Sequence, residues 1–170
     1  MKQIIGILTL LIFSFSLSAQ NVKINSKLKV DSTILKIKQL NSNYNVYSTF
    51  DNKNTDSLIV TIGTIGTSVT AIKIDLTEKP KAYIILWSDY AEYNGKDTLR
   101  VELEYFDLEL NASKFDKDAR IMGRISGKTN LISNSSEDYQ IEFNGEFNHI
   151  IGKLMMKKKV NDKYIIIDNH

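Results

Sequence analysis

The sequence predicts a mainly β protein, either an antiparallel β-sandwich or a small soluble β-barrel of about nine strands, with one short N-terminal helix. Three observations lead to this prediction. Apolar and polar residues alternate with a period of two along most of the chain after residue 20. Turn-forming residues separate these segments at short, regular intervals. The single proline, Pro80, lies between two predicted strands, where its missing N–H costs nothing.

Residues 1–19 are predicted to be a signal peptide. Lys2 gives a positive start, residues 4–15 are largely apolar, and small residues at positions 16–19 precede a cleavage site before Gln20. The apolar run is shorter than the ~20 residues that a membrane-spanning helix needs. We therefore expect residues 20–170 to form a single exported β-rich domain, located in the periplasm, in the medium or at the outer envelope.

The composition excludes several kinds of site. The chain has no cysteine, so it forms no disulfide and no thiolate metal site. Its formal net charge of +2 is too small to indicate a nucleic-acid partner. Residues 20–170 contain no apolar run of membrane-spanning length. The wealth of Ile, Lys and Asn is typical of an AT-rich genome, and together with the short leader it indicates a bacterial envelope protein.

The strands follow in order from the alternation. The first runs from Val22 to Val30, and a helix is predicted at residues 31–41, because Asp31 can cap it and Ile34, Ile37 and Leu40 form an apolar stripe. The same residues could instead extend the first strand. Further strands are predicted at residues 44–50, 58–62, 69–76, 120–126, 153–160 and 164–168.

The Asn-Gly pair at residues 94–95 predicts a two-residue hairpin loop. Such a loop sets Leu86 opposite Leu103 on the apolar face and Asp89 opposite Arg100 on the other face. The agreement between turn chemistry and side-chain pairing supports the hairpin.

Two further features shape the predicted sheet. The alternation changes phase at Tyr105 and Phe106, which predicts a bulge or a strand that passes between two packed layers. The strictest alternation runs from residue 139 to residue 148. A tight hairpin at residues 144–145 would oppose apolar to polar residues, so we predict one continuous strand through Gly145.

Side chains suited to catalysis are few, and we expect no catalytic set, metal site or cofactor. His149 lies on the apolar side of its strand, where a packed residue is favoured over a general base. Glu102 and Glu104 share a strand face at ~7 Å, inside the window of roughly 6.5–9.5 Å of inverting glycosidases, but a solvated polar face also explains them. Residues 51–56 lack the order of a calcium loop and predict a hairpin turn.

The aromatic residues supply the binding hypothesis. In the predicted hairpin, Tyr83, Ile85 and Trp87 lie on one face, beside two carboxylates and Phe106. Such a strip could stack a sugar or bind a partner, unless this face packs against a second sheet as core. We select Tyr83, Trp87 and Phe106 as candidate binding residues.

The expected function is that of an exported, non-enzymatic β domain that binds a partner protein, an envelope polymer or a small ligand. One alternative is a secreted, carboxylate-based hydrolase acting on envelope sugars. A second alternative is a structural component of the envelope.

Overall fold

The computed structural model describes residues 19–53, 57–64, 66–77, 79–90, 93, 95–133, 137–160 and 163–169, with side chains described from residue 20 to residue 155. The predicted signal peptide lies outside the described residues apart from the backbone of Ala19. Within these ranges the protein is all-β, and they contain no helix that is long and apolar enough to cross a membrane. The strands are β1 (Ala19–Ile24), β2 (Ile34–Gln39), β3 (Ser42–Val46), β4 (Thr49–Lys53), β5 (Leu58–Gly63), β6 (Ser68–Asp75), β7 (Lys81–Ser88), β8 (Thr98–Leu110), β9 (Arg120–Thr129), β10 (Ile132–Ser133), β11 (Asp138–Tyr139), β12 (Ile141–Ile150), β13 (Leu154–Val160) and β14 (Lys163–Asn169).

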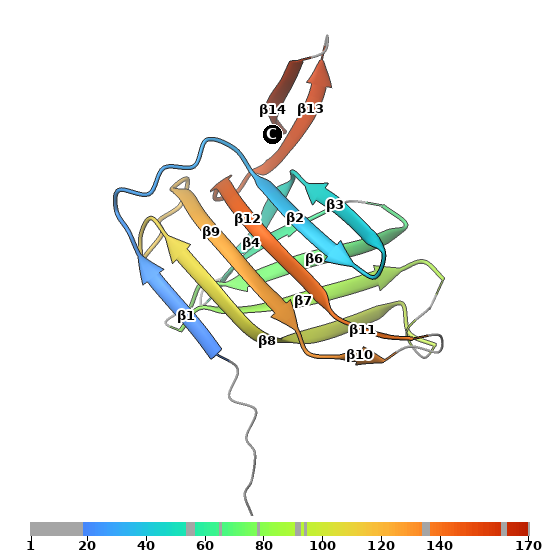
Figure 1. Ribbon diagram of the computed structural model, residues 1–170. Coiled ribbons are helices and arrows are strands. Elements are labelled where there is room, and N and C mark those ends of the chain that lie inside the picture. The colour runs from blue at the N-terminus through green and yellow to red at the C-terminus, as the bar shows by residue number, and fades with distance from the viewer. Residues whose placement is uncertain are drawn as a thin grey trace, which may run out of the picture.

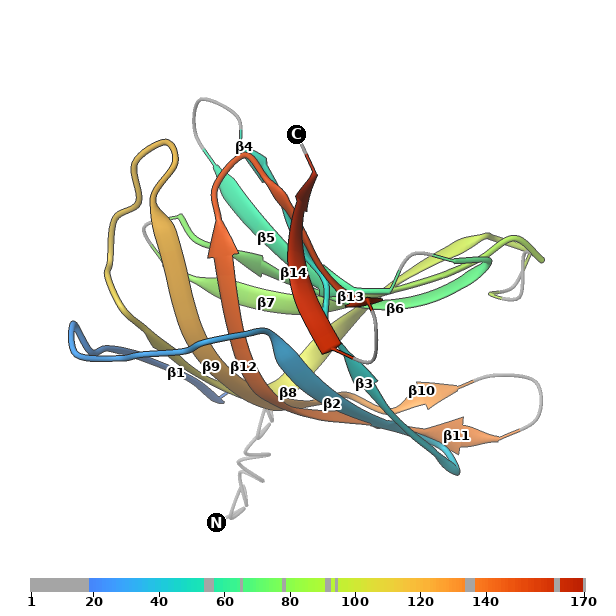
Figure 2. The same ribbon diagram turned by 90° about the horizontal axis from the view of Figure 1, so that it is seen from above.

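Most of these strands belong to one sheet that curls into a half-barrel (Figures 1 and 2). The strand order is β14-β13-β4-β5-β6-β7-β8-β9-β12-β2-β3, and neighbours along it are antiparallel. β1 adds to β8 as a parallel strand, and β10 pairs separately with β11. The predicted antiparallel, mainly β class is confirmed, and its architecture is a single curled sheet.

The predicted helix at residues 31–41 is wrong. Residues Ile34–Gln39 form β2, which lies between β12 and β3. Leu35 and Ile37 are buried while their neighbours Lys36 and Lys38 are exposed, the alternation of a strand with one dry face. Pairing with β12 and β3 satisfies the backbone hydrogen-bonding groups of this segment. It also buries Leu35, which does not belong to the apolar stripe of the predicted helix. An isolated helix of this length is marginally stable in water.

β8 is shared by two parts of the sheet. Residues 98–102 pair with β7, and residues 103–110 pair with β9. The register shifts between Leu103 and Tyr105, so the predicted change of phase is a bulge. We call the part built from β4–β7 the β7 half, and the part built from β9, β12, β2 and β3 the β9 half. The apolar core fills the space between the two halves.

The hairpin between β7 and β8 has the predicted faces but a different register. Leu86 pairs with Leu99 and not with Leu103, a shift of four residues (103 − 99). At the tip of the hairpin Tyr93 pairs with Lys96, as a two-residue Asn-Gly loop requires. The four-residue shift in register arises between this pair and Ser88, whose N–H bonds to the Asp97 carbonyl. A shift by an even number keeps every side chain on its face, which is why the apolar pattern could not reveal it.

β12 is a continuous strand through Gly145, as predicted. It pairs antiparallel with β9, so that Phe143 and Phe147 lie opposite Gly127 and Gly123. A Cβ atom at Gly127 would lie 2.6 Å from the Phe143 ring, and one at Gly123 would lie 2.3 Å from the Phe147 ring. The two glycines therefore leave the space in which the aromatic rings pack.

Replacing Gly145 by alanine is expected to lower the free energy of unfolding by about 1–3 kcal/mol. Its Cβ would meet the Ile34 carbonyl oxygen at 2.2 Å, so the backbones of β12 and β2 must separate. Urea denaturation followed by the fluorescence of the single tryptophan measures this change. Gly66→Ala is the control, because a Cβ there meets nothing closer than 4.0 Å. Equal stability of the two variants would contradict the proposed crowding between β12 and β2.

Candidate functional site

Tyr83, Ile85 and Trp87 lie in a row on the outer face of β7, and we call them the aromatic strip. All three are half-buried, and they alternate with Ile84 and Leu86, which face the core. On β6 the residues beside Trp87 and Tyr83 are Val69 and Lys73. The structure therefore brings the strip together on one face, as the sequence indicated.

Arg100 extends the aromatic strip on the β8 side. Its guanidinium carbon lies 3.8 Å from the centroid of the Tyr83 ring, a cation–π contact. The same side chain forms an ion pair with Glu102 at 2.7 Å. Arg100 is thus held over the tyrosine face with remaining N–H donors directed to solvent, since its side chain is 55% exposed.

Phe106 does not belong to the strip, contrary to the sequence interpretation. It is fully buried between the two halves of the sheet, with 0% exposure. The bulge at Leu103/Tyr105 moves Phe106 to the inner face and leaves Tyr105 40% exposed. The sequence signalled the change of phase but not which of the two aromatic residues would turn inward.

The two candidate carboxylates are each engaged by a neighbouring side chain. Glu102 pairs with Arg100, and Glu104 accepts a hydrogen bond from the Gln140 side-chain amide at 3.1 Å. Both side chains lie on the exposed side of β8. This arrangement is that of a solvated polar face.

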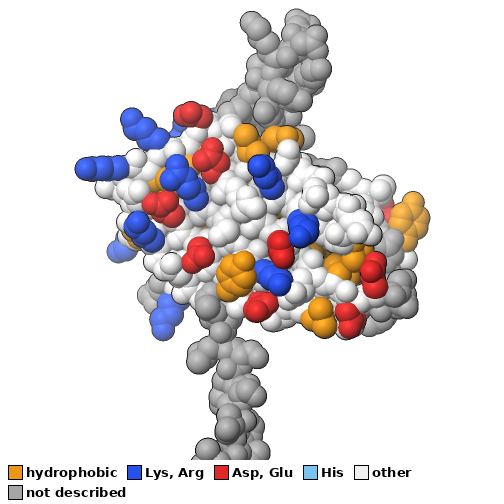
Figure 3. All heavy atoms as spheres, viewed as in Figure 1, with side chains coloured by type: hydrophobic (Ala, Val, Ile, Leu, Met, Phe, Trp, Pro, Cys, Tyr) orange, Lys and Arg blue, Asp and Glu red, His pale blue; other side chains and the backbone are white. Residues whose placement is uncertain are grey.

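The outer face of the β9 half differs from that of the β7 half. Figure 3 shows charged side chains of both signs spread over it. Arg124 contacts Glu109 at 3.6 Å and Glu146 at 3.7 Å, and Lys38 contacts Glu142 at 3.7 Å. Surface pairs of this kind contribute little to stability, but they leave this face well hydrated.

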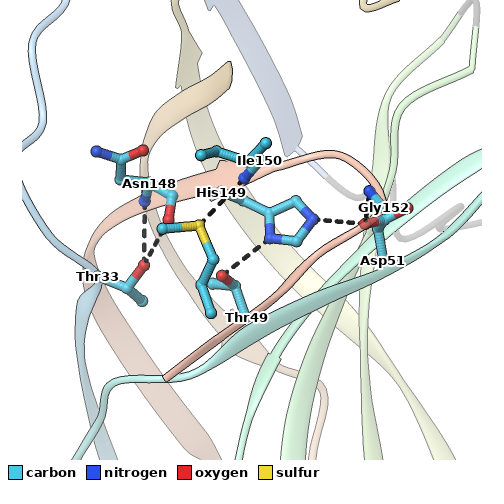
Figure 4. Close-up of polar contacts among 8 residues, drawn as sticks. Thr33, Thr49, Asp51, Asn148, His149, Ile150 and Gly152 are labelled. Carbon is cyan, nitrogen blue, oxygen red and sulfur yellow. Dashed lines mark hydrogen bonds and ion pairs between the residues drawn. The ribbon is translucent and has the colours of Figure 1, made fainter. Parts of the chain in front are cut away.

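A buried polar cluster joins β12 to β4, and we call it the His149 cluster: Thr49, Asp51 and His149 (Figure 4). His149 Nδ1 lies 3.0 Å from the Thr49 hydroxyl, and Nε2 lies 2.7 Å from Asp51 Oδ1. The same Oδ1 accepts the N–H of Gly152 at 2.7 Å. A neutral ring with its proton on Nε2 satisfies both contacts, because it donates to the carboxylate and accepts from the hydroxyl.

The order hydroxyl, imidazole, carboxylate is that of a hydrolytic triad, but these groups are closed to a substrate. Thr49 and His149 have 0% exposure, and the Asp51 side chain has 3%. A nucleophile must reach a substrate carbonyl, and Thr49 is packed in the interior. The cluster therefore acts as a polar bridge between two strands that are far apart in the sequence.

Sequence reasoning placed His149 on the apolar side of its strand and missed its two partners. Residues 44–50 were predicted as one strand and Asp51 as part of a loop, whereas β3 ends at Val46 and β4 runs from Thr49 to Lys53. Thr49 and Asp51 are two residues apart and so share a strand face. That spacing, together with a histidine on the apolar face of another strand, was the sequence signal that could have indicated the cluster.

A second polar bridge lies at Gln39, the last residue of β2. The Thr70 hydroxyl donates to Gln39 Oε1 at 3.0 Å, and the Tyr44 hydroxyl donates to the same oxygen at 3.3 Å. Burial raises the pKa of Tyr44, and the neighbouring Thr70 hydroxyl opposes the rise. This contact links β6 of the β7 half to β2 and β3 of the β9 half.

Burial lowers the pKa of His149 below its usual value near 6.5, since a charged ring is poorly solvated in the interior. The hydrogen bond to Asp51 and the charge of that carboxylate raise the pKa and so oppose burial in part. The neutral ring is thus the form that the folded protein favours.

In the part of the chain that the structure describes, no group of three or more His, Asp or Glu side chains is placed to hold a metal ion. The aromatic strip, by contrast, consists of half-buried side chains on the outer face of β7. No family model, curated protein or solved structure matches this chain.

The free energy of unfolding is expected to decrease as the pH falls below about 6.5. The unfolded chain takes up a proton on His149 at a higher pH than the folded protein, so acid favours unfolding until the folded pKa is also passed. Urea denaturation at a series of pH values between 7 and 5 measures the slope. His149→Gln removes this component, while His170→Ala, at the other histidine, retains it. A slope that survives in His149→Gln would assign it to other groups.

Asp51→Ala is expected to destabilise the fold by about 1–3 kcal/mol, because it deprives the buried His149 ring of its acceptor. The Gly152 N–H also loses its acceptor, but it is exposed and can bond to water instead. The exposed Asp107 on β8 is the matched control, and Asp107→Ala should change stability by no more than about 0.5 kcal/mol. Chemical denaturation of both variants at neutral pH decides; a similar small loss in both would show that the bridge contributes little.

Proposed function

We propose that this protein is an exported, non-enzymatic binding domain that takes an envelope polymer on the outer face of β7. The single observation that carries the proposal is the aromatic strip, a row of half-buried Tyr83, Ile85 and Trp87 that core packing does not require. Export rests on the predicted signal peptide at residues 1–19.

The chemistry of the strip suits a ligand with both apolar and hydroxyl groups. Tyr and Trp present flat apolar faces with a polar edge, on which the C–H face of a sugar ring can stack. Arg100, held over Tyr83, supplies N–H donors at the margin of the strip. Lys73 beside Tyr83 and Glu102 beside Arg100 add further polar groups.

The shape of the strip favours an extended ligand. Tyr83 and Trp87 are four residues apart on one strand, which corresponds to about 13 Å at the usual rise per residue. Small-molecule sites are commonly concave and enclose most of the ligand, whereas this row lies on the outer face of a sheet. A glycan chain lying along β7 could contact both aromatic rings, and an extended segment of a partner protein is the second candidate ligand.

A carboxylate-based hydrolase is less well supported by the same face. Glu102 is paired with Arg100, and Glu104 accepts from Gln140. An inverting glycosidase needs one carboxylic acid and one carboxylate across the sugar from each other, whereas these two lie on one strand.

Titration with soluble envelope glycan is expected to change the emission of Trp87, the single tryptophan. Trp87→Ala should weaken binding, measured by calorimetry, by about tenfold or more, which corresponds to ~1.4 kcal/mol. Tyr90→Ala is the aromatic control, because Tyr90 is 74% exposed and lies outside the strip. Glu104→Gln should leave binding unchanged.

Binding that Tyr90→Ala weakens as much as Trp87→Ala would overturn the assignment of the strip. Binding to an envelope protein but to no glycan would replace the polymer by the second candidate ligand. Hydrolysis of the glycan that is lost in Glu102→Gln would favour the enzyme instead.

A further inference from the structure

A row of polar side chains crosses the outer face of the sheet on the side of the β9 half, at right angles to the strands. The row takes one residue from each of the neighbouring strands β1, β8, β9, β12, β2 and β3, and strand pairing sets each residue beside the next. We call it the polar row: Asn21, Asp107, Ser126, Asn144, Lys36 and Asn45. At the usual spacing between strands, its length is about 24 Å.

Longer charged side chains stand on both sides of the polar row, two residues further along each strand. On one side Arg124 forms ion pairs with acidic residues of β8 and β12. On the other side Glu142 forms ion pairs with Lys38 at 3.7 Å and with Lys128 at 4.0 Å. Two hollows of about 360 and 370 Å³ lie between these charged side chains and share Asn144 in their linings. The polar row therefore forms the floor of a groove across the face that Figure 3 shows.

The preferences of β-strands do not explain the polar row. Asn and Asp are depleted in strands, because their side chains compete for backbone hydrogen bonds and favour turns. Nevertheless they supply every member of the row except Ser126 and Lys36. Within the described residues, no side chain of the row forms a hydrogen bond or an ion pair with another residue, in contrast to the paired charges on both sides. Their donors and acceptors are therefore available to a ligand that replaces water.

The chemistry of the groove suits a neutral chain that is rich in hydroxyl groups. Carboxamide and hydroxyl side chains both donate and accept hydrogen bonds, as sugar hydroxyls do. Asp107 and Lys36 have opposite formal charges, so the row has no net charge to attract a polyanion or a polycation. Tyr105 lies beside Lys128 and is 40% exposed, so it offers an aromatic face for a sugar ring at the edge of the groove.

We propose that this groove is a second binding site, which takes a neutral glycan chain laid across the strands. The length of the polar row favours several sugar units in line over a single sugar. The aromatic strip lies on β7, in the other half of the sheet, and shares no residue with the polar row. The groove therefore does not depend on the strip, and one molecule with both sites gains avidity for a polymer that reaches them together.

Two-dimensional NMR of the isotope-labelled protein, titrated with soluble hexasaccharides of glucose and of N-acetylglucosamine, tests the proposal. The signals of Ser126, Asn144 and Asn45 are expected to shift with at least one of the two. A disaccharide of the same sugar should bind at least about tenfold more weakly, because it contacts only part of the row. Added salt should leave the affinity nearly unchanged, since salt screens the attraction between charges and the ligand has none.

Asn144→Val removes a hydrogen-bonding group from the middle of the row and introduces a residue that strands favour. It should weaken hexasaccharide binding by about three- to tenfold. Stability to urea should be unchanged or raised, which separates a role in binding from a role in folding. Asn52→Val, the same substitution at an exposed position of β4 outside the groove, is the matched control and should leave the affinity unchanged.

Binding of neither hexasaccharide would overturn the proposal, and so would equal weakening by Asn144→Val and Asn52→Val. A preference for a charged oligosaccharide, with an affinity that falls steeply as salt is added, would overturn the neutral glycan as the ligand. Shifts confined to Tyr83 and Trp87 would overturn the groove and support the aromatic strip. Shifts in the polar row that persist in Trp87→Ala would support the groove independently of the strip.

Discussion

Val101 and Leu103 face the same interior as Phe106 and Leu108 only because β8 carries a bulge between the two pairs. Without the additional residue, the two ends of this strand would present their apolar side chains to opposite faces. With the additional residue, β8 pairs with β7 along its first part and with β9 along its second part. The bulge therefore allows both ends of β8 to face the single core between the two halves.

Curling the sheet brings strands from its two parts within reach of each other, and polar groups fix the contact. His149 on β12 meets Thr49 and Asp51 on β4, while Thr70 on β6 meets Gln39 on β2. An apolar contact tolerates sliding, whereas a buried hydrogen bond is lost if its partners move by a fraction of its length. The two bridges therefore define how the halves align, and the surrounding Ile, Leu and Phe residues supply most of the burial.

The sequence predicted the features that depend on local alternation. Most strand positions, the continuous β12, the change of phase in β8 and the outward row of Tyr83 and Trp87 follow from which residues alternate. The predicted strand at residues 44–50 is instead divided between β3 and β4. Features that depend on which distant strands meet were not predictable in the same way. The helical stripe of Ile34 and Ile37 is as regular as the strand pattern, and only the neighbours β12 and β3 favour the strand.

In the candidate site, too, residues that depend on local alternation were predictable and residues that depend on distant strands were not. Tyr83 and Trp87 could be placed from their own strand, but Phe106 required knowledge of where the bulge falls, and a single step in register moves a residue to the opposite face. The partners of His149 lie about a hundred residues away in the sequence, and no local pattern encodes such a pairing. The register of the β7–β8 hairpin differs by an even number, which alternation does not detect.

Asp51 has a consequence for how the protein responds to mechanical load. One carboxylate oxygen holds both the His149 ring, inside the half-barrel, and the Gly152 amide, in the turn that leads into the β13–β14 ribbon. A pull on β13 would therefore reach, through that turn, a carboxylate that also links β4 to β12. The bond to the His149 ring joins two buried side chains, where water does not replace a lost partner, whereas the bond to the Gly152 amide is exposed. The turn before β13 is thus linked through one carboxylate to a buried ring on β12.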